Sequence, residues 1–123
     1  MEQYKQYNLE DRLTNFAVSC IKIAESLPTS YAGNHLAGQL TRSGSAPALQ
    51  YGEAQGAESA KDFIHKMKIA LKELRETKNC LSIITKLNWN LNTDLASVHN
   101  ENVELIRIFY KSICTAEKNK DNR

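Results

Sequence analysis

The chain has 123 residues, of which 41% are hydrophobic and 24% are charged, and its formal net charge is +2. This length and composition predict one globular domain over residues 1–123, with enough apolar residues for a modest core. Two prolines and five glycines argue against a fold built from many tight turns. No apolar run approaches the ~20 residues of a membrane span, and the N-terminus lacks a signal-peptide hydrophobic segment, so we expect a cytoplasmic protein without membrane contact.

The N-terminal part of the chain predicts one long helix after a short polar lead. Residues 1–7 are polar, and we expect them to be loosely ordered. Asn8 is a good N-cap, and the apolar residues after it recur at helical spacing as far as Leu27, where Pro28 terminates the helix. The apolar face of this helix is wide, which indicates contact with more than one neighbouring element.

A second helix is predicted from Asn34 to Ala57, and its composition is unusual. The stretch Ser43-Gly44-Ser45 consists of small residues that let another helix approach closely. Pro47 removes one backbone hydrogen bond and is expected to kink the helix. Because the apolar spacing continues on both sides of the proline, we predict one kinked helix rather than two.

The most regular stretch of the chain runs from Ser59 to Leu87. Its apolar residues follow one another at alternating steps of four and three, the spacing of a helix that faces partner helices along one side. Ser59, with Asp62 three residues later, predicts a capping box at the start. At about 1.5 Å per residue this helix is roughly 44 Å long. The apolar seam comprises Phe63, Met67, Ala70, Leu74, Thr77, Leu81 and Ile84.

A fourth helix is predicted to begin at Asp94 or Asn100 and to end at Glu117, after an asparagine-rich connection over residues 88–93. Its apolar face is again wide, and residues 118–123 form a charged tail that we expect to be loosely ordered. Four helices with short connections predict an all-α fold, an antiparallel up-down-up-down four-helix bundle with a proline-kinked second helix.

A second stripe of residues follows the third helix at the same alternating steps, roughly 160° from the apolar seam. Evenly spaced cations on a rigid helix match the repeating phosphates of a nucleic acid, which they would bind with salt-dependent affinity. No aromatic residues alternate with these cations, so the pattern does not predict stacking on single-stranded bases. The basic stripe comprises Lys61, His65, Lys68, Lys72 and Arg75, and Asn79 follows it.

A simpler interpretation of the basic stripe is a solvated outer face. Its lysines would then serve solubility, with pairs such as Asp62–Lys66 and Lys72–Glu76 at i,i+4 spacing. Spacing alone favours this interpretation over nucleic-acid binding. The surplus apolar surface of the first and fourth helices independently indicates an oligomer or a docking surface for another protein.

Residue patterns typical of catalysis or metal binding are missing from the sequence. His35, His65 and His99 fall on separate segments, and none has a second ligand at i+3 or i+4. Glu53 and Glu76 could pair as carboxylates across the second and third helices, but salt bridges on the helix surface explain them better. The three cysteines lie apart without a C-x-x-C pair, which is typical of reduced thiols. We therefore expect no enzyme activity, no cofactor and no metal.

Several runs of the sequence, in this order and spacing, carry a resemblance that covers nearly the whole chain. They are Gln39 to Ser45, Tyr51 to Ala54, Glu58 to Met67 and Leu71 to Thr77. The chain resembles the bacterial four-helix-bundle proteins related to those encoded in intervening sequences of large-subunit ribosomal RNA genes. It is also similar to the accessory variability proteins of diversity-generating retroelements. The family's signature positions in this chain are Gln39, Arg42, Ser45, Glu53, Ser59, Asp62, Phe63, Glu73 and Glu76.

This resemblance implies a homopentameric antiparallel bundle with no catalytic activity. In the retroelement branch it implies binding to a reverse transcriptase and to nucleic acid through a basic surface. Most signature positions are interpreted as structural, with Arg42 and Glu53 packing helices together and Ser59 as a cap. The favoured function is a non-enzymatic oligomeric bundle that binds RNA, or a ribonucleoprotein such as a reverse transcriptase complex, through the basic stripe. The alternative is a protein–protein assembly scaffold with no nucleic-acid contact.

Overall fold

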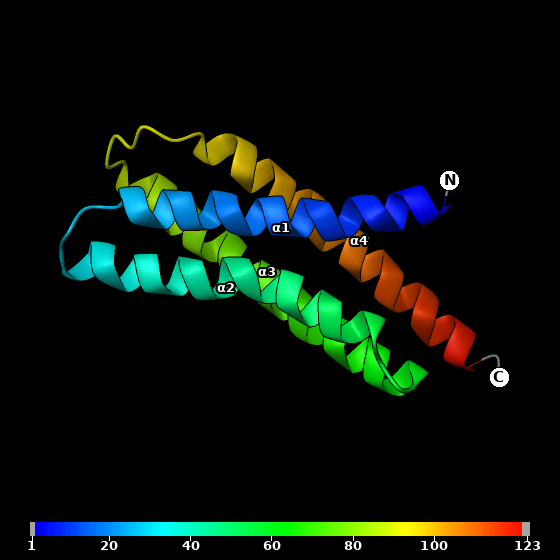
Figure 1. Ribbon diagram of the computed structural model, residues 1–123. Coiled ribbons are helices and arrows are strands. Elements are labelled where there is room, and N and C mark those ends of the chain that lie inside the picture. Colours follow the sequence, from blue (N-terminus) through cyan, green and yellow to red (C-terminus); the bar gives the residue numbers. More distant parts are fainter. Residues whose placement is uncertain (1, 122–123) are drawn as a thin grey trace.

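Four helices account for most of the chain in the computed structural model, which describes the backbone of residues 2–121 and the side chains of residues 9–121. Successive helices run in opposite directions (Figure 1), and residues 2–121 contain no strand. The predicted all-α four-helix fold is confirmed. Within the same residues, no helix combines the length and the apolar composition needed to cross a membrane. The helices are α1 (Glu2–Ser26), α2 (Tyr31–Gln55), α3 (Ala60–Leu87) and α4 (Leu95–Asp121).

Side-chain caps determine where three of the helices begin. Ser30, Ser59 and Asp94 each accept a hydrogen bond from the backbone N–H three residues later, at 3.0, 3.1 and 3.0 Å. Each cap satisfies one of the donors that have no partner within the helix. Because Ser30 is a cap, α2 begins at Tyr31, three residues before the predicted Asn34. The predicted cap of α3 is confirmed, and the earlier of the two predicted starts of α4 is correct.

The first and last helices are longer than the sequence pattern predicts. α1 starts at Glu2, so Asn8 lies inside the helix instead of capping it. α4 continues to Asp121, past the predicted end at Glu117. In both places the extra residues contain neither proline nor glycine, so nothing in them ends a helix. Residues 1, 122 and 123 lie outside the described part of the chain, and the loose order of the two termini stays a prediction.

The apolar seam of α3 lies at the centre of the core, because α3 packs against both α2 and α4. α1 packs mainly on α2 and touches α4 much less. The predicted seam is buried except for Phe63, which is half-buried. The largest buried side chains around it are Leu13, Phe16 and Ile23 from α1, Leu40 and Tyr51 from α2, and Leu105, Phe109 and Ile113 from α4.

Small residues bring α1 and α2 into close contact. Gly44 is buried, and a Cβ atom added to it would lie 2.5 Å from the Cβ atom of Cys20 on α1. A larger residue at this position would therefore push the two helices apart. α2 continues through the buried Pro47 as one helix, as predicted, while the kink at this proline stays a prediction.

Candidate nucleic-acid interface

The predicted basic stripe lies on the outer side of α3, opposite the buried seam. The helix is unbroken from Ala60 to Leu87, so residues at steps of three and four stay on one face. All side chains of the stripe are exposed on the chain, which places the cations where a ligand can reach them. They are Lys61, His65, Lys68, Lys72 and Arg75, with Asn79 beyond them.

One cation of the stripe is neutralised by a neighbouring helix. Lys68 Nζ lies 3.1 Å from a carboxylate oxygen of Glu117 on α4, and 56% of the Lys68 side chain is still exposed. A solvated pair of this kind contributes at most about 1 kcal/mol to stability. It nevertheless offsets one positive charge, which weakens the stripe as a surface for polyanions at this point.

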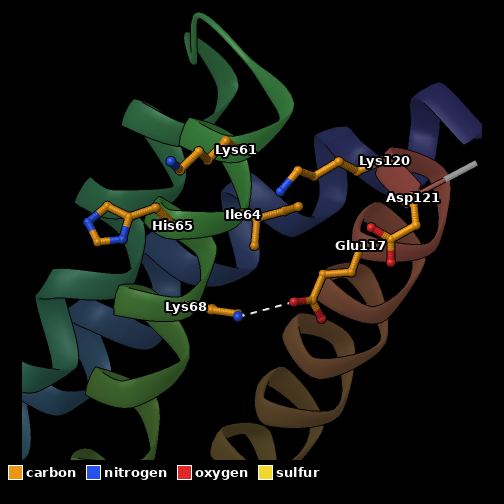
Figure 2. Close-up of a pocket in the computed structure, with 7 residues that line it drawn as sticks. All are labelled: Lys61, Ile64, His65, Lys68, Glu117, Lys120 and Asp121. Carbon is orange, nitrogen blue, oxygen red and sulfur yellow. Dashed lines mark ion pairs between the residues drawn. The ribbon is translucent and has the colours of Figure 1, made fainter. Parts of the chain in front are cut away.

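Three residues of the stripe line a cavity between the start of α3 and the end of α4 (Figure 2). Its volume is about 470 Å³. Figure 2 shows the amine of Lys120 reaching from α4 toward Ile64 of α3. Lysines outnumber carboxylates in the lining, so its net charge is positive but small. The lining residues are Lys61, Ile64, His65 and Lys68 from α3, and Glu117, Lys120 and Asp121 from α4.

Lys72 and Arg75, in the middle of the stripe, have no ion-pair partner among residues 9–121. The predicted pairing of Lys72 with Glu76 is wrong, because the Glu76 carboxylate lies 3.1 Å from Arg42 of α2 instead. A guanidinium competes well for a carboxylate because it offers several donors in a fixed plane. The two cations at the centre of the stripe therefore form no direct ion pair with the described residues, although the charge of Lys72 still contributes to lowering the pKa of Glu76.

The predicted pair between Asp62 and Lys66 is also replaced by a contact between helices. Lys66 Nζ lies 2.9 Å from Glu53 Oε1 on α2. The hydrogen bond to Glu53 and the attraction of its charge raise the pKa of Lys66. Glu53 therefore forms a surface salt bridge, as the sequence analysis predicted for this residue.

A cluster of charges joins α2 to α3 on the other flank of the stripe. The Arg42 guanidinium donates to both carboxylate oxygens of Glu73 at 2.9 and 3.0 Å, and to Glu76 at 3.1 Å. The side-chain oxygen of Gln39 lies 3.4 Å from the same guanidinium. Four signature positions of the family therefore meet in one place, where their visible effect is to hold the two helices together.

The two carboxylates of this cluster differ in their affinity for protons. Partial burial raises the pKa of Glu73, and its hydrogen bond with Glu76 adds to the rise. Hydrogen bonds with Glu73 and with Arg42 lower the pKa of Glu76. Hydrogen bonding to both acids raises the pKa of Arg42. Arg42 is thus held by two acids and is not free to contact a phosphate.

The remaining signature positions make local contacts away from the stripe. The Ser45 hydroxyl donates to the backbone carbonyl of Thr41 at 2.7 Å within α2. Ser59 caps α3, and Asp62 lies in the first turn of that helix, where a negative charge is favourable. Phe63 is half-buried against the core. None of these side chains contributes a charge or a donor to the basic stripe itself.

The groups that most often carry catalysis or metal binding are dispersed. The three histidines line three different cavities. In the described part of the chain, no group of three or more histidine, cysteine, aspartate or glutamate residues is placed to hold a metal ion.

Two of the three cysteines lie in the core, and the third is exposed. Burial raises the pKa of the Cys20 thiol to about 12, and burial also raises the pKa of Cys80. Both thiols therefore stay protonated at neutral pH, as the thiolate would be poorly solvated. Cys114 is exposed on α4.

The contribution of α4 to the cavity in Figure 2 is absent from the sequence prediction, which assigns Lys120 and Asp121 to a loose tail. The available signal is the lack of proline or glycine after residue 94, which lets the helix continue. The pairing of Glu117 with Lys68 depends on the register between two helices. No local pattern in the sequence encodes that register.

Comparison with known proteins identifies a family and a similar structure. A family model described as 23S rRNA-intervening sequence protein matches residues 5–111. The chain is also similar to a crystal structure of a protein of unknown function from the S23 ribosomal protein family of Bacteroides thetaiotaomicron VPI-5482. The two are 28% identical with a TM-score of 0.78, over 85% of this chain and 97% of that chain. No curated protein matches the chain in sequence.

Proposed function

Because the chain belongs to the family of 23S rRNA-intervening sequence proteins, we propose that it is a non-enzymatic oligomeric bundle that binds RNA through the outer face of α3. The observation that carries the proposal is the exposed run of cations in which Lys72 and Arg75 have no acidic partner among the described residues. Phosphates would supply those partners, and each contact would release counterions. The proposal assigns the protein no cofactor.

The cations of the stripe contribute unequally to this surface. Lys68 is held by Glu117, so a phosphate must compete with a carboxylate for it. Lys61 and His65 share a cavity with acidic as well as basic side chains. The strongest attraction for RNA therefore comes from Lys72 and Arg75, and the attraction is weaker toward the start of α3.

Filter binding of structured RNA across a salt series tests the proposal. Wild-type affinity should fall as salt rises, and the slope should decrease by roughly 1.5 in the Lys72→Ala/Arg75→Ala variant, since each phosphate contact contributes about 0.7–0.9. The matched control is Lys22→Ala/Lys111→Ala, which removes two exposed lysines from α1 and α4. A flat salt response, or an equal loss in both double variants, contradicts the assignment to α3.

The oligomer is proposed to be a homopentamer, as the family resemblance implies, in which copies pack through the outer face of α2. Residues at steps of three and four on this face are uncharged: Gly38, Thr41, Ser45, Leu49 and Gly52. Leu49 is 67% exposed, and Cβ atoms added to the two glycines would meet nothing within 4 Å. This shape favours close packing of another helix. Light scattering should therefore give five subunits for the wild type and fewer for Leu49→Glu.

A protein–protein assembly scaffold without nucleic-acid contact is the second candidate. It is favoured by large apolar side chains outside the α2 face, among them Val18 on α1 at 45% exposure and Ile83 on α3 at 50%. Affinity capture from the native host with and without nuclease separates the two functions. A partner retained after nuclease supports the scaffold. A partner lost with nuclease supports RNA or a ribonucleoprotein such as a reverse transcriptase complex.

A further inference from the structure

Two cavities lie along the groove between α3 and α4, and each takes residues from both helices. The first, shown in Figure 2, contains Lys68 and Glu117. The second has a volume of about 330 Å³ and includes Lys86 from α3 with Leu95 and His99 from α4. Each cavity therefore has an α3 lysine at its edge, and the basic character of α3 continues along one groove.

One ion pair and the two cavities relate positions along α3 to positions along α4. The helices are antiparallel (Figure 1). Lys86 is 18 residues after Lys68, and His99 is 18 residues before Glu117. At 1.5 Å per residue these two levels are about 27 Å apart. Residues of the two helices between these levels can therefore be assigned to the groove by their spacing from Lys68 and Glu117.

Counted along each helix from the Lys68–Glu117 ion pair, Arg75 of α3 and Tyr110 of α4 face the same groove. Arg75 is two turns after Lys68 and on the same face, and Tyr110 is two turns before Glu117 and on the same face. Both residues therefore lie between the two cavities, near the level where Lys72 and Arg75 lack acidic partners. The sequence pattern predicted no aromatic residues among the cations of the stripe, and α3 has none there. Tyr110 belongs to α4 instead.

The Tyr110 ring is 58% exposed, which leaves much of its apolar surface in water. Ile106, one turn away on the same helix, is half-buried and packs against the core. The ring therefore stands at the edge of the apolar part of the groove, with cations on the opposite side. Proteins that hold single-stranded nucleic acids combine such elements, because cations follow the backbone while aromatic rings stack on bases.

We propose that the groove between α3 and α4 binds single-stranded RNA, with Tyr110 stacked on a base and with Lys72 and Arg75 on the adjoining phosphates. This inference rests on the proposed RNA binding and specifies its substrate class, an unpaired strand. In a duplex the bases are stacked on one another and offer no face to a side chain. The two cavities then receive the strand on either side of the central stacking position.

Fluorescence anisotropy with two probes tests this inference, a labelled oligouridine of about 12 nucleotides and an RNA duplex of the same length. Tyr110→Ala should weaken oligouridine binding by about 5- to 100-fold, the loss of one base–aromatic stack, and should leave duplex binding unchanged. Tyr110→Phe keeps the ring and should bind both probes like the wild type. Tyr31→Ala is the matched control, because Tyr31 is 94% exposed on α2, outside the groove.

The outcomes separate this inference from the function on which it rests. Unchanged oligouridine binding by Tyr110→Ala, while Lys72→Ala/Arg75→Ala loses binding, overturns the stacking but leaves RNA binding intact. Equal losses for both probes overturn the preference for single strands. No binding of either probe by the wild type overturns both proposals. Light scattering of Tyr110→Ala must give the wild-type subunit number, because a change would assign the ring to a contact between copies instead.

Discussion

α3 packs against both α2 and α4, and the two contacts differ in how their polar side chains are paired. Along α2–α3, charged side chains on one helix meet opposite charges on the other in two places. In the core of the same contact, Thr77 Oγ1 lies 2.9 Å from Ser43 Oγ. Polar groups on this side of α3 are therefore largely satisfied from within the chain.

The α3–α4 contact contains a buried polar side chain that is only partly satisfied. Asn102 is fully buried; its amide nitrogen donates to the backbone carbonyl of Leu74 at 3.1 Å, but its side-chain oxygen has no partner among the described residues. Further along the same contact, lysines outnumber acids in the cavity of Figure 2. We infer from this difference that α2 holds α3 in place and that the α4 side of α3 remains available to a ligand.

Buried hydroxyls give the largest expected contrast between the two contacts. Thr77→Val should destabilise the protein by about 1–3 kcal/mol, because it leaves the buried Ser43 hydroxyl without its partner. Asn102→Leu should change stability by less than about 1 kcal/mol, because removing a buried oxygen that has no partner offsets the loss of the hydrogen bond to the Leu74 carbonyl. The measurement is the free energy of unfolding from urea denaturation of each variant.

A double variant controls for the loss of packing in this comparison. Ser43→Ala/Thr77→Val removes both hydroxyls, so it should be more stable than the sum of the single changes implies. If Asn102→Leu cost more than Thr77→Val, the better-satisfied polar contact would lie on the α4 side, and the contrast between the two contacts would be reversed.

Titration of the buried Cys20 thiol tests how tightly the core of the bundle is packed. The pKa of Cys20 is about 12 in the folded chain against 9.0 ordinarily, so its thiol ionises in the unfolded chain first. Its contribution to stability is complete below pH 9 and is lost as the pH rises toward 12. The loss should reach about 1.4 kcal/mol between pH 8 and pH 10, measured as the difference in pH dependence between wild type and Cys20→Ala.

The exposed cysteine of α4 supplies a control for the burial of Cys20. Cys114 is exposed on α4, so a thiol reagent can reach it in the folded chain. A thiol reagent at pH 8 should label Cys114 at once and Cys20 only after unfolding. Rapid labelling of Cys20 in the folded protein would contradict the tight contact with Gly44 on which its burial depends.

Substitutions of Arg42 on α2 and of Arg75 on α3 should separate a structural role from a binding role. Arg42→Ala should cost about 0.5–1 kcal/mol of stability, since it leaves two neighbouring carboxylates without their cation, and should leave RNA binding unchanged. Arg75→Ala should leave stability unchanged and lower the salt slope of RNA binding by about 0.7–0.9. Urea denaturation and filter binding on the same samples compare the two variants. The reverse pattern would make Arg75 the structural residue and Arg42 the RNA-binding residue.

Most of the fold follows from periodicity that can be read locally. The seam through Leu74 and Leu81 is buried because its three- and four-residue steps keep it on one face of a continuous helix. The starts of helices are harder to predict from the sequence. Ser30 and Asn8 are both residue types that cap helices well, but only Ser30 lies at a helix start. A cap residue signals a start only where the residues before it are not themselves helical.

The candidate site was predictable only in part, for a related reason. The exposure of Lys72 and Arg75 follows from their position opposite the seam on the same helix. The pairing of Lys68 with Glu117 depends on how two helices are aligned. That alignment results from the packing of the whole core, so no pattern within either helix reveals it.

The smallest predicted effect concerns Glu117, the acid that pairs with Lys68 of the stripe. Glu117→Gln removes a carboxylate 3.1 Å from Lys68 and so adds one unit of positive charge to the groove. RNA binding at low salt should strengthen by roughly 2- to 5-fold, the effect of one charge in a solvated site. Stability should fall by less than about 0.5 kcal/mol, because a half-exposed ion pair contributes little.

The matched control for Glu117→Gln is Glu104→Gln, which removes an exposed acid of the same helix that pairs within α4 with Arg107 at 3.7 Å. Both variants change the net charge equally, so a gain common to both reflects the overall charge of the protein. A gain confined to Glu117→Gln shows that the RNA passes this point of the α3–α4 groove. Weaker binding by Glu117→Gln would mean that the ion pair positions Lys68 for the ligand instead of competing with it.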